Sequence, residues 1–276
     1  MTRRSLIALI AVICIFACWQ HFRNPSDVAA KASIDKASSQ NPTLSDDSIA
    51  TALMHVQMPG NIPSQIKKYE GFTLSFNKDN HTPNYVAWEL APSETDGTQS
   101  RYNKFWQDPE IEGCANTSDY VKSGFDRGHI CPSADQKWSE NAMKDCFVMA
   151  NICPQDHRLN AGAWATLEKR ERKWSVSHGG LIIISGPIYE QADTQTIGHT
   201  KVRVPSAFFK IFLAHKLEKP EAIAVIYPNM PAHGQMTDYY MTVDEVEQIT
   251  GFDFFSALPD KTEEETERTF NRKIWK

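Results

Sequence analysis

The sequence predicts a single α+β domain in which a central, mainly antiparallel sheet is flanked by helices. Three observations predict this class: short apolar runs that resemble strands, two strand-like runs joined by a polar turn, and two stretches of helix formers that end at glycines. With 276 residues, the chain is long enough for one large domain or two small ones. No repeat or low-complexity tract follows residue 60, so one domain over residues 61–276 is the simplest interpretation.

Four stretches are typical of strands. Residues 69–90 contain two strand-like runs around a turn rich in Lys, Asp, Asn and His, which predicts a hairpin. Residues 179–189 are apolar and β-branched until Gly186 and Pro187, which predicts a buried central strand. Residues 206–216 and 221–229 predict two more strands of the same sheet.

Two stretches are typical of helices. Good helix formers run from about Asn160 to Val176 and end at Gly179. On this helix, Leu167 and Trp174 outline one face, while Asn160, Glu168 and Arg172 project toward another.

The second helix begins after Thr242, which forms a capping-box pattern with Glu245. It ends at Gly251.

The N-terminal segment has the composition of a targeting signal. Arg3 and Arg4 precede an apolar run of about 14 residues, shorter than the roughly 20 that a membrane span needs. Residues 1–20 are therefore interpreted as a signal peptide or as a membrane or lipid anchor, the last through Cys18. Each alternative predicts an exported domain: secreted, periplasmic or tethered to the membrane outside the cytoplasm. Residues 21–60 are expected to form a flexible linker with a short helix near residues 48–57.

Charge and cysteines narrow the function classes. The net charge of −5 argues against a protein that coats DNA through bulk positive charge, although a local basic cleft remains compatible with it.

Beyond the N-terminal segment, the cysteines are Cys114, Cys131, Cys146 and Cys153. Two disulfides, metal ligation and free buried thiols all remain open, but the absence of a CxxC pair disfavours zinc.

The stretch SGFDRGHICPSADQKW, residues 123–138, contains the first candidate catalytic group. In an extended segment, Arg127 and His129 point to the same side. The positive charge of the arginine favours a neutral imidazole that acts as a general base, and its guanidinium matches a phosphate. The alternative is a structural histidine in a polar turn.

Five further residues are candidates on their chemistry. Asn151 and Asn160 offer the neutral oxygen ligands that a hard cation accepts, although Asn160 also suits a helix N-cap. Glu168 is a candidate for holding a metal-bound water and Arg172 for binding a phosphate, or the two form an ordinary surface ion pair. Arg101 is a candidate phosphate contact or an exposed loop arginine.

Several motifs together resemble one known family. They are DRGHICPSAD, NICPQDHRLNAGAWATLE, ISGPIY, VPSAFFKIFL and TGFDFFSALPD, and they keep their order between residues 69 and 259. The chain resembles the DNA/RNA non-specific endonucleases of the DRGH type, a family that includes endonuclease G. The resemblance implies a ββα-metal (His-Me finger) active-site motif, with the base on one element and the metal ligand on the helix that follows.

The resemblance also implies a role for each candidate residue. His129 matches the general base, Asn160 the ligand of a single Mg²⁺, for which Mn²⁺ is an expected substitute, and Glu168 the residue that holds a metal-bound water. The arginines expected around the phosphate, in catalysis and in substrate binding, are Arg101, Arg127 and Arg172. Asn151 matches a second asparagine near the centre, expected to support substrate binding.

The function implied by the resemblance is Mg²⁺-dependent hydrolysis of DNA and RNA to products with 5′-phosphate ends, with weak sequence preference. A homodimer, an inhibitor protein and membrane attachment through the N-terminus are left open. Two alternatives belong to other classes: a catalytically silent binding module on the same fold, and a phosphodiesterase for small substrates.

Overall fold

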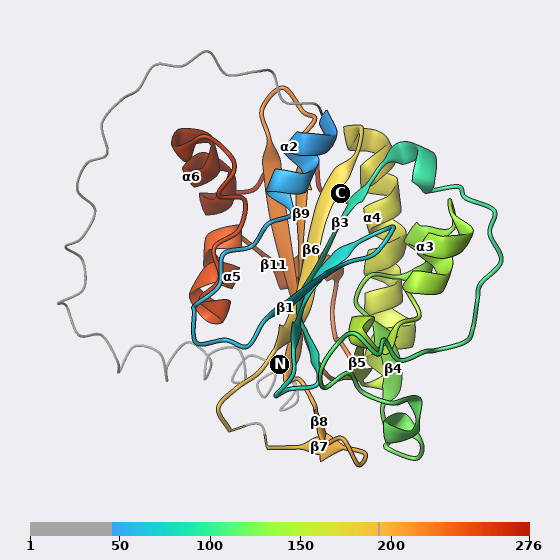
Figure 1. Cartoon of the computed structure of the whole chain (residues 1–276). Coiled ribbons are helices and arrows are strands. Elements are labelled where there is room, and N and C mark those ends of the chain that lie inside the picture. The colour runs from blue at the N-terminus through green and yellow to red at the C-terminus, as the bar shows by residue number, and fades with distance from the viewer. Residues whose placement is uncertain (1–45, 193) are drawn as a thin grey trace. The chain divides into compact units, whose positions relative to one another are not determined.

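The fold is built on a seven-stranded antiparallel sheet with the strand order β1-β2-β3-β6-β9-β10-β11 (Figure 1). The computed structural model describes residues 46–192 and 194–276. The strands of the sheet are β1 (Gln65–Lys68), β2 (Thr73–Asn77), β3 (Thr82–Leu90), β6 (Leu181–Ile188), β9 (Ala207–Ala214), β10 (Glu221–Pro228) and β11 (Tyr240–Met241). Two smaller pairs lie outside it: β4 (Asp126–His129) with β5 (Ile152–Gln155), and β7 (Thr196–Ile197) with β8 (Val202–Arg203).

Helices cover both faces of the sheet (Figure 1). One face carries α3 (Glu140–Asp145) and α4 (Ala165–His178), and the other carries α2 (Asp46–Leu53), α5 (Val243–Thr250) and α6 (Asp260–Arg268). Short 3-10 helices span Pro92–Glu94, Thr117–Tyr120, Ser133–Gln136, Met149–Asn151 and Met236–Tyr239. The predicted fold class is therefore confirmed.

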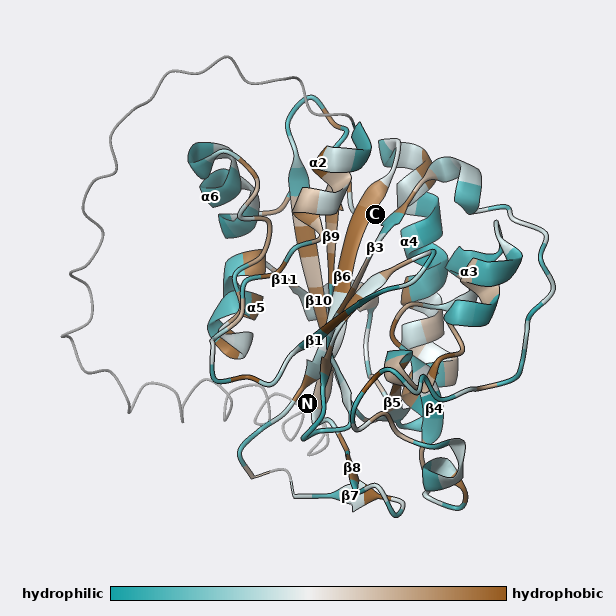
Figure 2. Ribbon diagram, in the orientation of Figure 1, coloured by the Kyte–Doolittle hydropathy of each residue, from teal (hydrophilic) through white to brown (hydrophobic). Residues whose placement is uncertain are grey.

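Burial on both faces explains why the central strands are continuously apolar (Figure 2). Side chains alternate along a strand, so Ile183 of β6 belongs to the core that includes Trp88 and Trp164. Its neighbour Ile182 belongs to the second core, together with Val246 of α5. The predicted hairpin corresponds to β2 and β3, and the three other predicted strands correspond to β6, β9 and β10.

The two predicted helices are confirmed as α4 and α5. Gly179, with φ of 77°, ends α4, and Gly251, with φ of 72°, ends α5. The capping box forms as predicted: the Glu245 backbone N–H donates to Thr242 Oγ1 (3.2 Å), and the Thr242 N–H donates to Glu245 Oε2 (2.8 Å). A π-helical stretch, Leu159–Trp164, leads into α4 and was not predicted.

The folded part begins before the predicted boundary at residue 61. The short helix expected near residues 48–57 is α2, and its Ala50 and Leu53 are 2% and 1% exposed in the second core. Beyond it, Gln57 pairs with Asp253. The flexible linker predicted for residues 21–60 is thus wrong for residues 46–60, because their apolar side chains are buried against the sheet. The proposed signal or anchor and the rest of the linker lie outside the described residues.

Two further features bear on the sequence predictions. The cysteines Cys114, Cys131, Cys146 and Cys153 are all buried and free, so the alternative of two disulfides among them is not observed. Within residues 46–192 and 194–276, no helix is both long enough and apolar enough to cross a membrane.

Candidate active site

The hairpin of β4 and β5 and the helix that follows it form the predicted ββα arrangement. Asp126 pairs with Gln155 and His129 with Ile152, so the four residues of the DRGH motif are the whole of β4. Gly128 is needed because the Gln155 side chain lies directly over it. A Cβ at this position would be 2.3 Å from Gln155 Oε1 and 2.6 Å from Gln155 Cβ.

His129 is held in an aromatic setting. Its ring lies 5.3 Å from the ring of Phe105 and 4.8 Å from the ring of Phe147, measured between centroids. The residue is 9% exposed, and its Nε2 is buried without a hydrogen-bond partner in the described part of the chain. A buried polar atom without a partner is costly in a folded protein, and its presence is typical of a group that meets a water or a substrate.

Two guanidinium groups flank this histidine. Arg127 lies over Phe105, with 4.5 Å between its Cζ and the ring centroid, so Arg127 and His129 contact the same ring, as two residues on one side of a strand do. Arg101 lies over Phe147 at 4.9 Å and donates a hydrogen bond to Ser133 Oγ.

Burial, followed by the charges of Arg101 and Arg127, lowers the pKa of His129 to about 3. The imidazole is therefore neutral at physiological pH, the state that a general base requires.

Asp126 orients the side chain of Asn160. The Asn160 Nδ2 donates to Asp126 Oδ2 at 2.8 Å, and the same oxygen lies 2.9 Å from His157 Nδ1. In residues 46–192 and 194–276 no hydrogen bond engages Asn160 Oδ1, so the carbonyl oxygen is available to a ligand. The N-cap alternative for Asn160 is wrong, because Asp156 caps this helix through the backbone N–H groups of residues 158 and 159.

Arg172 pairs with a residue that follows the DRGH motif. Its Nη1 lies 2.7 Å from Oδ1 of the fully buried Asp135, which also accepts a hydrogen bond from Trp88 Nε1 at 3.2 Å. The alternative of a surface ion pair between Glu168 and Arg172 is therefore wrong. Burial raises the pKa of Glu168 to about 7, against the lowering effect of nearby positive charges, of which Lys210 is the strongest.

A buried ion pair beneath the site was missed by sequence reasoning. Lys210 Nζ, on β9, lies 3.0 Å from Glu171 Oε2, and both side chains are 0% exposed. The ammonium lies 4.7 Å from the ring of Trp164 and 5.3 Å from that of Trp88. The available signal was a lysine in the middle of the apolar run AFFKIFLA, since an unpaired lysine is rarely buried.

Asn151 is fully buried and has a different environment from the one expected of a substrate contact. Its Oδ1 accepts from the Cys131 N–H (2.9 Å), and its Nδ2 donates to the carbonyls of Cys131 (2.9 Å) and Cys146 (2.8 Å). These bonds argue against the substrate-binding role predicted for Asn151. They indicate that it fixes the backbone just after His129.

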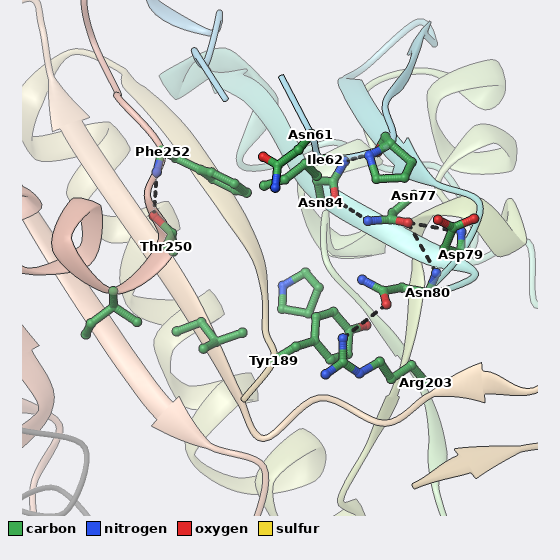
Figure 3. A pocket seen from close by; sticks show the side chains of 14 residues that line it. Asn61, Ile62, Asn77, Asp79, Asn80, Asn84, Tyr189, Arg203, Thr250 and Phe252 are labelled. Carbon is green, nitrogen blue, oxygen red and sulfur yellow. Dashed lines mark hydrogen bonds between the residues drawn. The ribbon is translucent and has the colours of Figure 1, made fainter. Parts of the chain in front are cut away.

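Two of the hollows on the described surface bear on the position of the site. One, of about 400 Å³, is lined by Arg101 together with Ser133 and Lys137, so it adjoins the site. The other, of about 350 Å³, lies near the β2–β3 turn (Figure 3). Its polar groups bond to one another: Asn77 Nδ2 donates to Asn84 Oδ1 (3.0 Å) and Arg203 Nη1 to Asn80 Oδ1 (3.3 Å). Arg101, whose charge acts on His129, is thus the candidate site residue that lines the first hollow.

The donor set fits a hard divalent cation. Asn160 offers an amide oxygen whose orientation is set by Asp126, and Glu168 offers a half-buried carboxylate on the same helix. Magnesium prefers oxygen ligands and is commonly held by one or two protein groups while it keeps several waters.

The chain is similar to proteins that are named as nucleases. The family model for DNA/RNA non-specific endonucleases matches residues 49–261. Mitochondrial nuclease EXOG of Danio rerio is 34% identical over 207 residues, which cover 69% of this chain and 60% of that protein. Human mitochondrial endonuclease G is 29% identical over 206 residues, which cover 69% of each chain. The matched region thus spans less than two thirds of the length of the zebrafish relative.

A solved structure has the same fold. The crystal structure of the EndoG/EndoGI complex matches with a TM-score of 0.67 and 23% identity, and the match covers 72% of this chain and 90% of that one. At this identity the likeness supports the fold alone.

The export predicted from the N-terminal segment is contradicted by these comparisons. The relatives in zebrafish, human and Schizosaccharomyces pombe are named as mitochondrial nucleases, not as exported ones. Two arginines before a short apolar run are a compositional signal, and composition alone does not distinguish one cellular address from another. The motif resemblance, in contrast, is confirmed: the chain belongs to the DNA/RNA non-specific endonuclease family.

Proposed function

We propose that the chain is a Mg²⁺-dependent nuclease that hydrolyses phosphodiester bonds of DNA and RNA, with His129 as the general base. The observation that carries this proposal is the state of His129: buried, neutral, flanked by two guanidinium groups, and without a hydrogen-bond partner for Nε2 in the described residues. A neutral imidazole with a free nitrogen beside cations that suit a phosphate is the arrangement that attack by water on phosphorus requires.

His129 takes a proton from the attacking water through Nε2. With a pKa of about 3 in the free protein, His129 would be a weak base, because burial and two nearby positive charges disfavour its protonated form. A phosphate bound between Arg101 and Arg127 brings negative charge close to the ring, and this charge favours the protonated form. Substrate binding therefore raises the basicity of His129 at the step in which it is needed.

The arginines bind the phosphate and stabilise the charge that develops on it. Phe105 and Phe147 hold the guanidinium groups of Arg127 and Arg101 by stacking, which limits their freedom before substrate arrives. These contacts are to the backbone of the nucleic acid, so sequence preference is weak and salt inhibits. Attack by an external water uses no 2′-hydroxyl group, so DNA and RNA are both substrates.

Asn160 Oδ1 and Glu168, the latter through a water, would hold the Mg²⁺. When bound, the ion would stabilise negative charge on the phosphate and on the leaving oxygen. Asp126 contributes indirectly, because its hydrogen bond to Asn160 Nδ2 turns the amide oxygen away from Asp126. A homodimer and an inhibitor protein remain predictions.

The test is a cleavage assay on the full chain with plasmid DNA, single-stranded DNA and RNA, in Mg²⁺ or in EDTA. We expect all three substrates to be cut in Mg²⁺ and to remain intact in EDTA. Asn160→Ala should abolish or strongly reduce cleavage at any Mg²⁺ concentration while the melting temperature stays close to that of the wild type. Intact substrates in Mg²⁺ would refute the proposal, and competition by mononucleotide esters would point to a small-substrate phosphodiesterase instead.

A further inference from the structure

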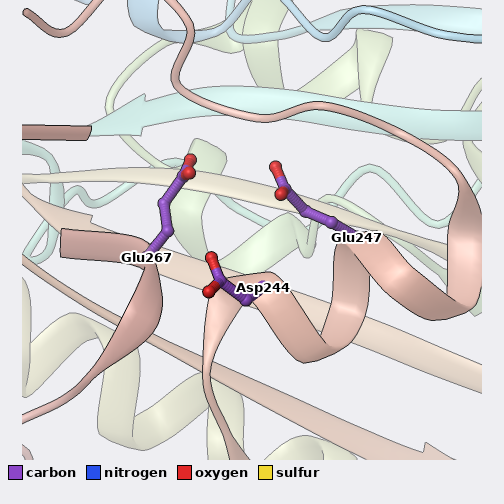
Figure 4. Close-up of side chains that lie close together, drawn as sticks. All are labelled: Asp244, Glu247 and Glu267. Carbon is purple, nitrogen blue, oxygen red and sulfur yellow. The ribbon is translucent and has the colours of Figure 1, made fainter. Parts of the chain in front are cut away.

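Three carboxylates meet between α5 and α6, on the face of the sheet opposite α4 (Figures 1 and 4). Asp244 and Glu247 are three residues apart on α5 and therefore share one side of that helix. Glu267 comes from the end of α6. One oxygen from each of the three groups lies within 4.8 Å of the others.

Among the described residues, no positively charged side chain pairs with this cluster. Glu267 is only 6% exposed, and its Oε1 is buried without a hydrogen-bond partner in residues 46–192 and 194–276. Over the same residues, none of the three carboxylates forms an ion pair within 4.0 Å. Glu247 is anchored on one side, because its Oε1 accepts a hydrogen bond from the Phe254 N–H at 2.8 Å.

The surrounding charges increase the repulsion. Burial, followed by the charges of Glu247, Glu263, Asp244 and Asp253, raises the pKa of Glu267 to about 9. The positive charge that acts on Asp244 is that of Arg268, whose Nη1 is 3.3 Å from Glu264 Oε1. Bringing these carboxylates together in ionised form is therefore unfavourable unless a cation joins them.

We propose that Asp244, Glu247 and Glu267 bind a Ca²⁺ ion that links α5 to α6, at a site separate from the active site. The donors are all carboxylate oxygens, which hard cations prefer, and no nitrogen or sulfur ligand joins them in the described cluster.

The number of carboxylates favours Ca²⁺ over Mg²⁺. Ca²⁺ takes about six to eight oxygen ligands in a flexible geometry, and a carboxylate can bind it through one or both oxygens. Mg²⁺ keeps several of its waters and is usually held by one or two carboxylates. Three carboxylates whose oxygens lie within 4.8 Å of one another therefore fit Ca²⁺ better. This site does not depend on the proposed nuclease activity.

The test is thermal unfolding of the full chain after removal of metals with EDTA and its washout. Addition of Ca²⁺ to about 1 mM should raise the melting temperature by about 3–6 °C, the shift expected of a ligand well above its dissociation constant. Titration calorimetry should find a Ca²⁺ site that Mg²⁺ at equal concentration fills less well.

Four variants make the result specific. Glu267→Gln and, independently, Asp244→Asn should remove the Ca²⁺ shift, and Glu267→Gln in EDTA should melt at or above the wild type because repulsion is relieved. Glu264→Gln, the same change at an exposed position of α6, should retain the shift, and so should Asn160→Ala. No shift in the wild type, or an equal shift in both cluster variants, would overturn the proposal. Loss of the shift in Asn160→Ala would place the ion at the active site instead.

Discussion

Buried carboxylates occur on both faces of the central sheet, but the charges of their neighbours differ between the two faces. On the α4 face, Glu171 pairs with Lys210 and Asp135 pairs with Arg172. On the α5–α6 face, Glu267 has no ion-pair partner in the described residues. The first group is built from opposite charges and the second from like charges.

The pKa values of Glu168 and Glu267 reflect this difference in neighbours. Burial raises both, but Lys210 and two arginines limit the rise at Glu168 to about 7, whereas the acidic neighbours of Glu267 add to the rise and bring its pKa to about 9. Burial still dominates at Glu171, whose pKa is raised well above its usual value although Lys210 lies beside it. Compensated charge keeps the active-site groups in defined positions before substrate or metal arrives. A cluster of carboxylates without a countercharge can instead bind a proton or a cation.

The largest effect expected is on catalysis at the compensated face. His129→Ala should reduce cleavage of DNA and RNA by about 10²–10⁴-fold, the usual contribution of a general base, because no other described group replaces its free Nε2. Steady-state rates on plasmid DNA would measure this, with circular dichroism as the check on folding. Glu267→Gln, on the other face, should keep the rate within about twofold of the wild type, because the groups that we expect to act in catalysis lie on the α4 face. Near-normal cleavage by His129→Ala would place the base elsewhere.

Next in size is the effect of removing one countercharge. Lys210→Met leaves Glu171 buried and unpaired, which should lower the free energy of unfolding by about 3–5 kcal/mol. Urea unfolding followed by tryptophan fluorescence would measure it. The double variant Lys210→Met, Glu171→Leu should recover most of that loss, because the buried charge is gone. If the single variant were as stable as the wild type, the compensation inferred for this face would be wrong.

A matched pair of substitutions compares the two faces directly. Glu168→Gln should reduce cleavage by about 10–100-fold, the usual cost of removing a group that orients a metal site, and should raise the Mg²⁺ concentration needed for activity. Glu267→Gln makes the same chemical change without affecting the Mg²⁺ dependence. Assays of both variants over a Mg²⁺ series would test this. Equal Mg²⁺ dependence in the two variants would mean that Glu168 does not act near the metal.

Much of the fold could be predicted because it depends on local patterns. The apolar runs of β6 and β9, the capping box at Thr242 and the glycines that end α4 and α5 are all local signals. Helix α6 was missed because its sequence, DKTEEETER, carries no apolar side chain. Its position depends on what lies beneath it, which no local pattern reveals.

The candidate site was only partly predictable for the same reason. The DRGH motif and the helix after it are close in sequence, so their residues could be grouped in advance. The pairs formed by Lys210 with Glu171 and by Arg172 with Asp135 join residues 39 and 37 positions apart, and only the tertiary fold brings them together. Asn151 was assigned to the right region, but the sequence could not indicate that its amide faces the backbone.

The smallest effect for each pH unit, at most about 1.4 kcal/mol from each group, is expected on the pH dependence of stability, and it has opposite signs on the two faces. His129 has a pKa of about 3 when folded and about 6.5 when unfolded, so the unfolded chain binds the extra proton between these values. The histidine therefore lowers the free energy of unfolding by about 1.4 kcal/mol for each pH unit between about 6.5 and about 3. Glu267, with a raised pKa, costs stability as pH rises from about 4.5 toward 9. Urea unfolding in EDTA at pH 5–8 should show a shallower acid slope in His129→Asn and a shallower alkaline slope in Glu267→Gln. Curves parallel to that of the wild type would mean that neither group is buried as the structure describes.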